Sequence, residues 1–526
     1  MENKIRNSIL VITTVSFVGI LLRVYYFPYD IQFSYDTLDY FAYALTERSI
    51  GKFPENVALA NNGWPTVVSF FMSISNSNDL MNLTYLQRTL GMSFSILTVI
   101  PVYFLARRFF TEKIAVIAPA LFILEPNIVI NSVSGGTLPI FIFLSTTAIW
   151  LFLSNRIKII IISFAIIGFL SFMRYEGLLL IIPFSIMFFV RYRYEKNELK
   201  KYFLMIIVFL LVITPIAALR VEAYGYDGML SNMIDGIIHV TNILGNGIQS
   251  PVEGEEEWVI EGENNIPDFL RFGIINLFKF LGITMLPIFI FFISISIVYL
   301  IKQKNELKIN ARFFSVVFYS LVLLIPAFYI YGRHIEEIRY LFILYPIFAL
   351  LSLYSIQVIF NKIRNHSLIT SLIICGVVVL SLGFIEFERE DNSFDIEAFS
   401  IARVIVNEQY GYNTFPPVTK YIKSAEVYDK FHDSIKFDEN GHVERLSNRI
   451  DYEDHTSIES FLSNSKEKGL THLIISDRDQ PEFLEDVFLN EKKFPYLEKI
   501  YDSTDKNFIH IVKIFQINYE IFSNFK

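Results

Sequence analysis

The sequence has little of what disulfide frameworks, metal centres and nucleotide sites require. Its one cysteine, Cys375, cannot form an intrachain disulfide and belongs to no zinc cluster. The eight histidines are scattered, without an HExxH or similar spacing. The sequence also contains no glycine-rich phosphate loop. The scattered histidines argue against a dedicated histidine-based metal site.

Charge is scarce as well. Charged residues make up only 19% of the 526 positions and hydrophobic residues 53%, whereas a soluble chain carries about a quarter charged residues. The apolar excess is concentrated in runs such as 157–173 and 202–219, which approach the length needed to cross a hydrocarbon core of about 30 Å. Because such runs would aggregate in water, the sequence predicts an α-helical polytopic membrane protein.

The apolar stretches number about eleven. They lie at about 8–27, 84–105, 112–131, 136–154, 157–173, 176–192, 202–219, 281–301, 311–331, 338–360 and 366–386. The first is interpreted as an uncleaved span and not a signal peptide, because it ends with Arg23 and three aromatic residues, without a small-residue cleavage site. Lysines and arginines gather in alternate connections, which the positive-inside rule places in the cytoplasm. The N-terminus is then cytoplasmic, and an odd span number puts the C-terminal part outside.

Two domains are expected. Residues 1–387 form the transmembrane domain, with a first outer loop at 28–83 and a long outer loop at 220–280. In the first loop, helical spacing of apolar residues from Asp36 to Ile50 predicts an amphipathic helix on the membrane surface, and the run 64–75 is too short to span. The long loop holds the acidic run Gly254–Trp258, a candidate divalent-cation site whose alternative interpretation is a solvated, mobile surface.

The second expected domain, 388–526, carries 27 acids against 17 bases, a net charge of −10. This acidic balance argues against nucleic acid as a partner. Helical patterns cover 394–408, 457–468 and 481–491, and strand patterns cover 472–476 and 509–517. They predict a small, soluble, extracytoplasmic α/β domain with a mixed sheet.

Two acids follow the first apolar stretch. If a helix begins at Asp36, then Asp36 and Asp39 lie three positions apart on one face, within reach of a single ligand or proton. A carboxylate at the outer membrane surface can act as a general base on an acceptor hydroxyl. The alternative is that Asp36 caps the helix and Asp39 is a solvated helix residue. The two acids alone do not decide between these interpretations.

Basic residues occur at the predicted outer ends of spans, opposite the side that the positive-inside rule favours. They are Arg88, Arg174, Arg333, His334 and Arg339. Guanidinium groups bind phosphate oxygens in a bidentate fork, so this set is a candidate site for a lipid phosphate or diphosphate. The alternative is snorkelling to headgroups or pairing with nearby acids. Those acids are Glu176, Glu336 and Glu337.

The order of these pieces resembles the GT-C superfamily of polytopic glycosyltransferases. The resemblance covers about residues 8–360 and rests on short motifs: Tyr35–Tyr40 in the first outer loop, Leu86–Arg88 leading into Val102–Phe110, Glu125-Pro126, and Met173–Leu178. The branch that fits these motifs most closely contains the dolichyl-phosphate-mannose protein mannosyltransferases and the lipid A glycosyltransferases, often described as RgtA/B/C/D-like.

The resemblance implies that a sugar moves from a polyprenyl (dolichyl)-phosphate donor to an acceptor hydroxyl on the outer face, with inversion. The acceptor would be a protein, lipid or glycan. Asp36 matches the first-loop acid that serves as the catalytic base, and the arginines would hold the departing lipid phosphate. The resemblance fixes no cofactor and leaves metal dependence open, with a divalent cation as the candidate.

The sequence departs from the family pattern at two places. Many relatives carry an acid in the second outer loop, where this chain has Gly136–Pro139. The WWDYG motif of oligosaccharyltransferases is absent from 388–526, which argues against en bloc transfer of an oligosaccharide to asparagine. The missing second-loop acid keeps open a non-catalytic subunit with the same fold. A transporter or flippase of lipid-linked glycans is the other alternative.

Overall fold

The structure is a computed structural model, and its contacts divide the chain into two compact units. It describes residues 2–236, 238, 266–302, 310–388 and 393–525, except 56, 58, 364, 409, 414, 430–434, 439, 440, 446, 453, 454, 478, 479, 507, 509 and 510. The first unit comprises Met1–Phe27, Gly51–Phe71 and Tyr85–Arg389, and the second comprises Pro28–Ile50, Met72–Thr84 and Glu390–Lys526. The acidic run Gly254–Trp258 lies outside the described residues.

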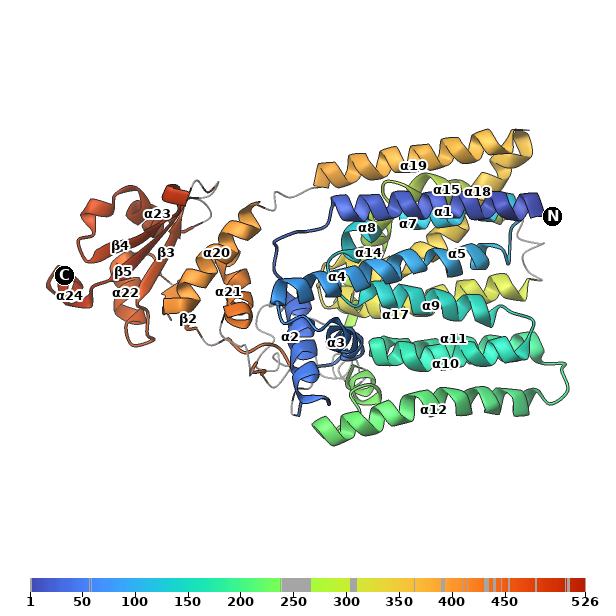
Figure 1. Cartoon of the computed structure of the whole chain (residues 1–526), viewed down its shortest axis with the longest axis horizontal. Coiled ribbons are helices and arrows are strands. Elements are labelled where there is room, and N and C mark those ends of the chain that lie inside the picture. The colour runs from blue at the N-terminus through green and yellow to red at the C-terminus, as the bar shows by residue number, and fades with distance from the viewer. Residues whose placement is uncertain are drawn as a thin grey trace. The chain divides into compact units, whose positions relative to one another are not determined.

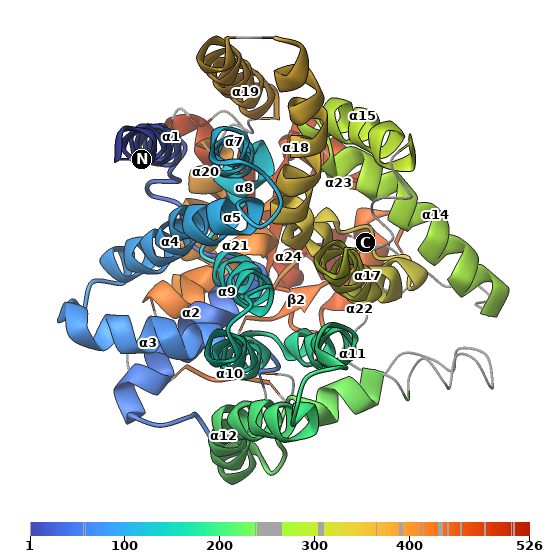
Figure 2. The ribbon, with the colours of Figure 1, turned by 90° about the vertical axis from the view of Figure 1, so that its right-hand side faces the viewer.

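The first unit is built from helices, several of which are seen end-on in Figure 2. They are α1 (Glu2–Tyr25), α3 (Gly63–Ser75), α4 (Leu80–Leu97), α5 (Val99–Ala106), α6 (Glu112–Ala115), α7 (Ile117–Ile123), α8 (Pro126–Ser132), α9 (Leu138–Phe152), α10 (Ile157–Met173), η1 (Tyr175–Leu180), α11 (Ile181–Tyr192), α12 (Glu198–Tyr224), α14 (Ile266–Thr284), α15 (Phe289–Lys302), α17 (Ala311–Gly332), η2 (Ile338–Leu344), α18 (Tyr345–Lys362) and α19 (His366–Glu388). The end of α3, from residue 72, and the start of α4, to residue 84, are grouped with the second unit. The predicted helical membrane architecture is confirmed.

Seven helices among the described residues are long and apolar enough to cross a membrane. The number rises to nine if two bent pairs each count as one span, and α9 and α10 are shorter apolar helices. The bent pairs are 112–132, with a bend of 56°, and 267–302, with a bend of 112°. The count of about eleven spans therefore stays a prediction.

Several predicted stretches are divided in the structure, and the one at 281–301 has the larger of the two bends, 112°. The sequence predicts a single apolar span at 281–301, but α14 ends at Thr284 and α15 begins at Phe289. Helix α14 begins well before the apolar window, at Ile266, because its apolar residues follow a helical period between charged ones such as Asp268 and Arg271.

Close helix packing in this unit depends on glycine. An added Cβ at Gly63, where α3 begins, would lie 2.3 Å from the carbonyl oxygen of Phe172 in α10. An added Cβ at Gly168 of α10 would lie 3.0 Å from Cβ of Val212 in α12. Within a bilayer the hydrophobic effect does not drive helices together, and small residues allow the close backbone contacts on which helix association depends. The start of the short apolar segment at 64–75 is thereby fixed against α10.

The second unit contains a five-stranded mixed sheet in the order β2-β1-β3-β5-β4. Figure 1 labels β2, β3, β4 and β5 of this sheet. Its elements are α2 (Tyr35–Ile50), α20 (Ser393–Glu408), β1 (Tyr412–Asn413), α21 (Pro416–Asp429), β2 (Arg449–Ile450), α22 (Ile458–Ser465), β3 (His472–Ser476), α23 (Glu482–Leu489), β4 (Leu497–Asp502), β5 (Val512–Ile517) and α24 (Tyr519–Phe525). Strand β1 is parallel to β2 and β3, and β5 is antiparallel to β3 and β4. The predicted small α/β domain with a mixed sheet is confirmed.

Part of the predicted first outer loop packs within this second unit. The predicted amphipathic helix is α2, and the ring of Phe41 stacks on Tyr428 of α21 with centroids 5.7 Å apart. The Ser424 hydroxyl donates to the carbonyl oxygen of Phe33. The sequence placed all of 28–83 with domain 1–387, whereas contacts group 28–50 and 72–84 with the tail. The boundaries of functional domains stay a prediction.

Candidate active site

The turn that leads into α2 carries an exposed acid. Asp36 lies in the first turn of α2 and is exposed, so its carboxylate also benefits from the positive end of the helix dipole. Five non-glycine residues of the described chain have positive φ, and Tyr35, with φ 50°, is the one that is neither Asn, Asp nor His. A left-handed conformation is costly for such a bulky residue. Costly backbone of this kind clusters at functional sites, which favours a role for this turn.

Asp39 has a different environment, although it lies only one turn further along α2. It is 5% exposed, so its interpretation as a solvated helix residue is wrong. Its Oδ2 lies 2.7 Å from Nδ1 of His442, and its Oδ1 accepts from the backbone N–H of Val443 at 2.8 Å. Both oxygens are therefore engaged in joining α2 to the segment around residue 442.

The carboxylate of Asp39 holds the pKa of His442 above its ordinary value of 6.5. Asp438 acts in the same direction, and Lys423 and burial oppose it. Because the pKa of His442 is raised in the folded state, the charged pair stabilises the fold fully when the pH is below the ordinary pKa of histidine. This stabilisation is lost as the pH rises through the raised pKa.

Amide hydrogen exchange in α2 is therefore expected to accelerate, beyond its intrinsic pH dependence, as the pH rises from about 6 to about 9. In His442→Gln this extra acceleration should vanish. His455→Gln, which removes another histidine of the same unit, should keep it. Exchange in α2 that follows only the intrinsic rate in the parent protein would contradict the role given to this pair.

Arg174 separates α10 from η1 in the first unit. Its Nη2 lies 2.7 Å from Oε1 of Glu176, which is the pairing alternative noted for this residue. Its guanidinium carbon also lies 5.7 Å and 5.8 Å from the ring centroids of Phe141 and Tyr340. Cation–π contacts of this kind fix the orientation of the guanidinium plane. Arg174 is thus held in a defined position by Glu176 and the two aromatic rings.

The segment after α17 holds three more of the predicted residues. Arg333 is the C-cap residue of α17, and its guanidinium carbon lies 5.8 Å from the ring centroid of Tyr329. His334 has a positive φ of 62°, and its ring centroid lies 4.0 Å from that of Phe272. Arg339 pairs with Glu337 at 3.2 Å and is about half exposed. Because Tyr340 follows Arg339 and contacts Arg174, the structure brings Arg174 and the η2 residues together.

Arg88 lies in α4 and is 4% exposed. Its neighbour Gln87 donates to the carbonyl oxygen of Gly135 at 2.8 Å, and Nε1 of Trp64 donates to the same oxygen at 2.8 Å. One carbonyl thus ties α3 and α4 to the loop before α9. Gly136–Pro139, where many GT-C relatives carry an acid, follows this carbonyl directly.

Sequence reasoning missed two buried arginines. Arg23 is fully buried and donates to Ser132, Ser95, and the carbonyl oxygens of Gly19 and Ile123 at 2.9–3.0 Å. Arg220 is also fully buried and donates to Oδ1 of Asn62 at 2.7 Å. The only signal in the sequence is an arginine inside or beside an apolar run, where an unsatisfied charge would be costly.

Among the residues that the structure describes, no group of three or more His, Cys, Asp or Glu side chains could hold a metal ion.

No protein-family model matches the sequence, and no curated protein matches it. Among solved structures, the chain is similar to the oligosaccharyltransferase of Archaeoglobus fulgidus in complex with Zn and sulfate, with a TM-score of 0.56, 14% identity, and coverage of 88% of this chain and 67% of that one. It is also similar to AglB of Archaeoglobus fulgidus in complex with an inhibitory peptide and a dolichol-phosphate, with a TM-score of 0.52, 12% identity, and coverage of 89% and 69%.

A third solved structure is ArnT of Cupriavidus metallidurans bound to undecaprenyl phosphate, with 9% identity and 97% coverage of both chains. Its TM-score is 0.45, and at this score the likeness supports no conclusion. The identities to the oligosaccharyltransferases are low, so those likenesses establish the fold alone. The mannosyltransferase-like branch stays a prediction. The chain is a multi-pass membrane protein with the fold of the GT-C glycosyltransferases, as its motifs predicted.

Proposed function

We propose that the protein is a glycosyltransferase that moves a sugar from a polyprenyl-phosphate donor to an acceptor hydroxyl. The observation that carries the proposal is the GT-C fold combined with an exposed acid at the turn into α2. A solved structure of similar fold was obtained in complex with a dolichol-phosphate, which supports a polyprenyl carrier. Oligosaccharide transfer to asparagine is not included, because the tail lacks the WWDYG motif.

In this proposal Asp36 acts as the general base. The carboxylate takes the proton of the acceptor hydroxyl while the oxygen attacks the anomeric carbon, and the bond from that carbon to the lipid phosphate oxygen breaks. Attack from the side opposite the leaving group gives inversion. Asp39 is left out of the proton transfer, because His442 and Val443 already occupy both of its oxygens.

The leaving group keeps a negative charge, which has to be stabilised as the bond breaks. We assign this task to Arg174 first, with Arg88, Arg333, His334 and Arg339 as further candidates. Arg174 is supported most strongly, because the two aromatic rings and Glu176 already hold it in place. A preorganised donor costs no reorganisation during the reaction.

Sidedness belongs to the proposal too. The basic connections are assigned to the cytoplasm, which places the N-terminus inside and the C-terminal domain outside. Sugar transfer then takes place on the extracytoplasmic face of the cell membrane.

One observation favours the flippase alternative. Glu125 is fully buried and stands at the 56° break between α7 and α8, where Asn127 donates to it at 3.0 Å. Transporters place buried ionisable groups at broken helices in this way. A flippase would move the lipid-linked sugar across the bilayer without transferring the sugar to a new carrier.

The test uses the full-length protein in proteoliposomes with dolichyl-phosphate-[³H]mannose and a cell-envelope extract as acceptor source. Appearance of label in a product that is no longer linked to the lipid is the expected result. Label that stays on the carrier but changes leaflet supports the flippase, and label that does neither supports a non-catalytic subunit. Parallel reactions with EDTA and with added Zn²⁺ test metal dependence, because the similar oligosaccharyltransferase was crystallised with Zn.

A further inference from the structure

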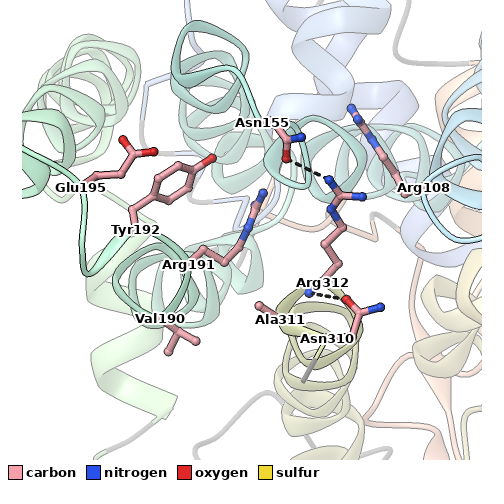
Figure 3. A pocket seen from close by; sticks show the side chains of 9 residues that line it. All are labelled: Arg108, Asn155, Val190, Arg191, Tyr192, Glu195, Asn310, Ala311 and Arg312. Atoms are coloured by element: carbon pink, nitrogen blue, oxygen red, sulfur yellow. Dashed lines mark hydrogen bonds between the residues drawn. The ribbon is translucent and has the colours of Figure 1, made fainter. Parts of the chain in front are cut away.

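A polar pocket lies at one end of the helical bundle of the first unit, where α9 and α11 end and α17 begins. Its volume is about 460 Å³. It is lined by Arg108, Asn155, Val190, Arg191, Tyr192, Glu195, Asn310, Ala311 and Arg312 (Figure 3). Three of these nine residues are arginines, and Figure 3 shows the guanidinium group of Arg312 next to Asn155, with Arg191 and Arg108 on either side of it.

Two of the arginines are held by neutral partners. Nη2 of Arg191 donates to the carbonyl oxygen of Ser154 at 2.8 Å, and its Nη1 donates to that of Phe152. Nη2 of Arg312 donates to Oδ1 of Asn155 at 2.9 Å. These bonds orient the guanidinium planes without neutralising their charge.

The positive charge of the pocket has no carboxylate partner within the described parts of the chain. None of the three arginines forms an ion pair there, and Glu195, the one acid in the lining, pairs with Lys201 instead. The Nε of Arg108 is buried without a hydrogen-bond partner. Burial and the like charge of Arg312 lower the pKa of Arg108. Like charges gathered in this way are unfavourable unless an anion joins them.

The positive-inside rule alone would account for arginines at this end. It accounts less well for their convergence, because arginines that only snorkel extend separately into water or headgroups, whereas these three are half-buried and line one hollow. A phosphate group has the oxygens to accept from several planar forks at once.

This pocket is separate from the proposed donor site. Arg312 stands at the start of α17 and Arg333 caps its end, and the 22 residues of this helix span about 33 Å. Arg191 likewise lies at the end of α11 that is opposite to η1 and Arg174. One phosphate therefore cannot occupy both places.

We propose that the Arg108–Arg191–Arg312 pocket binds a phosphate group, either of an anionic lipid headgroup or of a soluble phosphate ester. This proposal does not rest on the proposed sugar transfer. Its position on the bundle end that carries the basic connections makes it accessible to headgroups of the inner leaflet in the proposed orientation.

The test measures binding to the purified full-length protein by native mass spectrometry and by thermal shift. The probes are phosphatidylglycerol, phosphatidylcholine and inorganic phosphate. Phosphatidylglycerol retained over phosphatidylcholine identifies a lipid headgroup, and stabilisation by inorganic phosphate alone identifies a soluble ligand; either result supports the site. The proposal is overturned if none of the three probes binds. It is also overturned if both lipids are retained equally and inorganic phosphate does not raise the melting temperature.

Variants then locate the site. Arg108→Gln and Arg312→Gln are expected to weaken binding of the retained probe about tenfold each, which matches loss of one charge-assisted hydrogen bond. Arg193→Gln, which removes an arginine that stacks on Tyr194 outside the lining, should bind like the parent. If the glutamine variants do not fold, Arg312→Lys replaces them and should still weaken binding because the planar fork is lost. Undiminished binding in the folded lining variants would overturn the proposal.

Discussion

Replacing Asp36 with Asn is expected to lower the rate of sugar transfer by roughly 100- to 10,000-fold. The amide keeps the size of the side chain but cannot accept the proton of the acceptor hydroxyl. Because Asp36 is exposed on the first turn of α2, the fold should change little. The rate is measured with the labelled donor in proteoliposomes, and folding is checked by thermal melting of the purified protein.

Glu55→Gln is the matched control for this change. Glu55 also lies in the predicted first outer loop and is exposed, and its partner among the described residues is Lys52, on the surface. Removal of the Glu55 charge should leave the rate of sugar transfer unchanged, since exposed ion pairs contribute little to the stability of the fold. Full activity of the Asp36→Asn protein would remove Asp36 from the mechanism, even if transfer itself had been demonstrated.

Replacing Arg174 with Gln is expected to lower kcat/KM for the lipid-linked donor roughly 100-fold, because one charged donor to the leaving phosphate is lost. Arg174→Lys should recover only part of the activity, since lysine keeps the charge but not the fork or its stacking on Phe141 and Tyr340. Arg156→Gln is the control: Arg156 precedes the other end of α10 and is exposed.

The Arg174 variant also leaves the partly buried Glu176 without its partner, which could reduce activity through stability alone. The double variant Arg174→Gln/Glu176→Gln separates the two causes. If phosphate binding is lost, the double variant stays as inactive as the single one. Recovery of transfer in the double variant would show that Arg174 is only structural.

Local sequence patterns were sufficient to predict many of the helices and strands. Helix α10 and strand β3 have the residues predicted for them, 157–173 and 472–476, because each is an apolar run with clear ends. Strand β4 and helix α21 were not predicted. Strand β4 exposes three consecutive side chains, Glu498–Ile500, and it is fixed by pairing with β5, which depends on residues distant in the chain.

The candidate site could be predicted in part. The acid at the turn into α2 follows from its place after the first apolar run, and the motifs around it indicated the fold. The partner of Asp39 could not be predicted, because His442 stands 403 positions away and carries no motif of its own. The environment of Arg23 depends likewise on segments up to 109 positions distant.

The most direct test of the proposed mechanism is a structure of the full-length protein bound to a polyprenyl phosphate. The expected result is a phosphate within hydrogen-bond distance of the Arg174 guanidinium, no more than one loop away from Asp36. A phosphate bound more than one loop from Asp36, or held only by Arg108, Arg191 and Arg312 at the other end of the bundle, would contradict the mechanism.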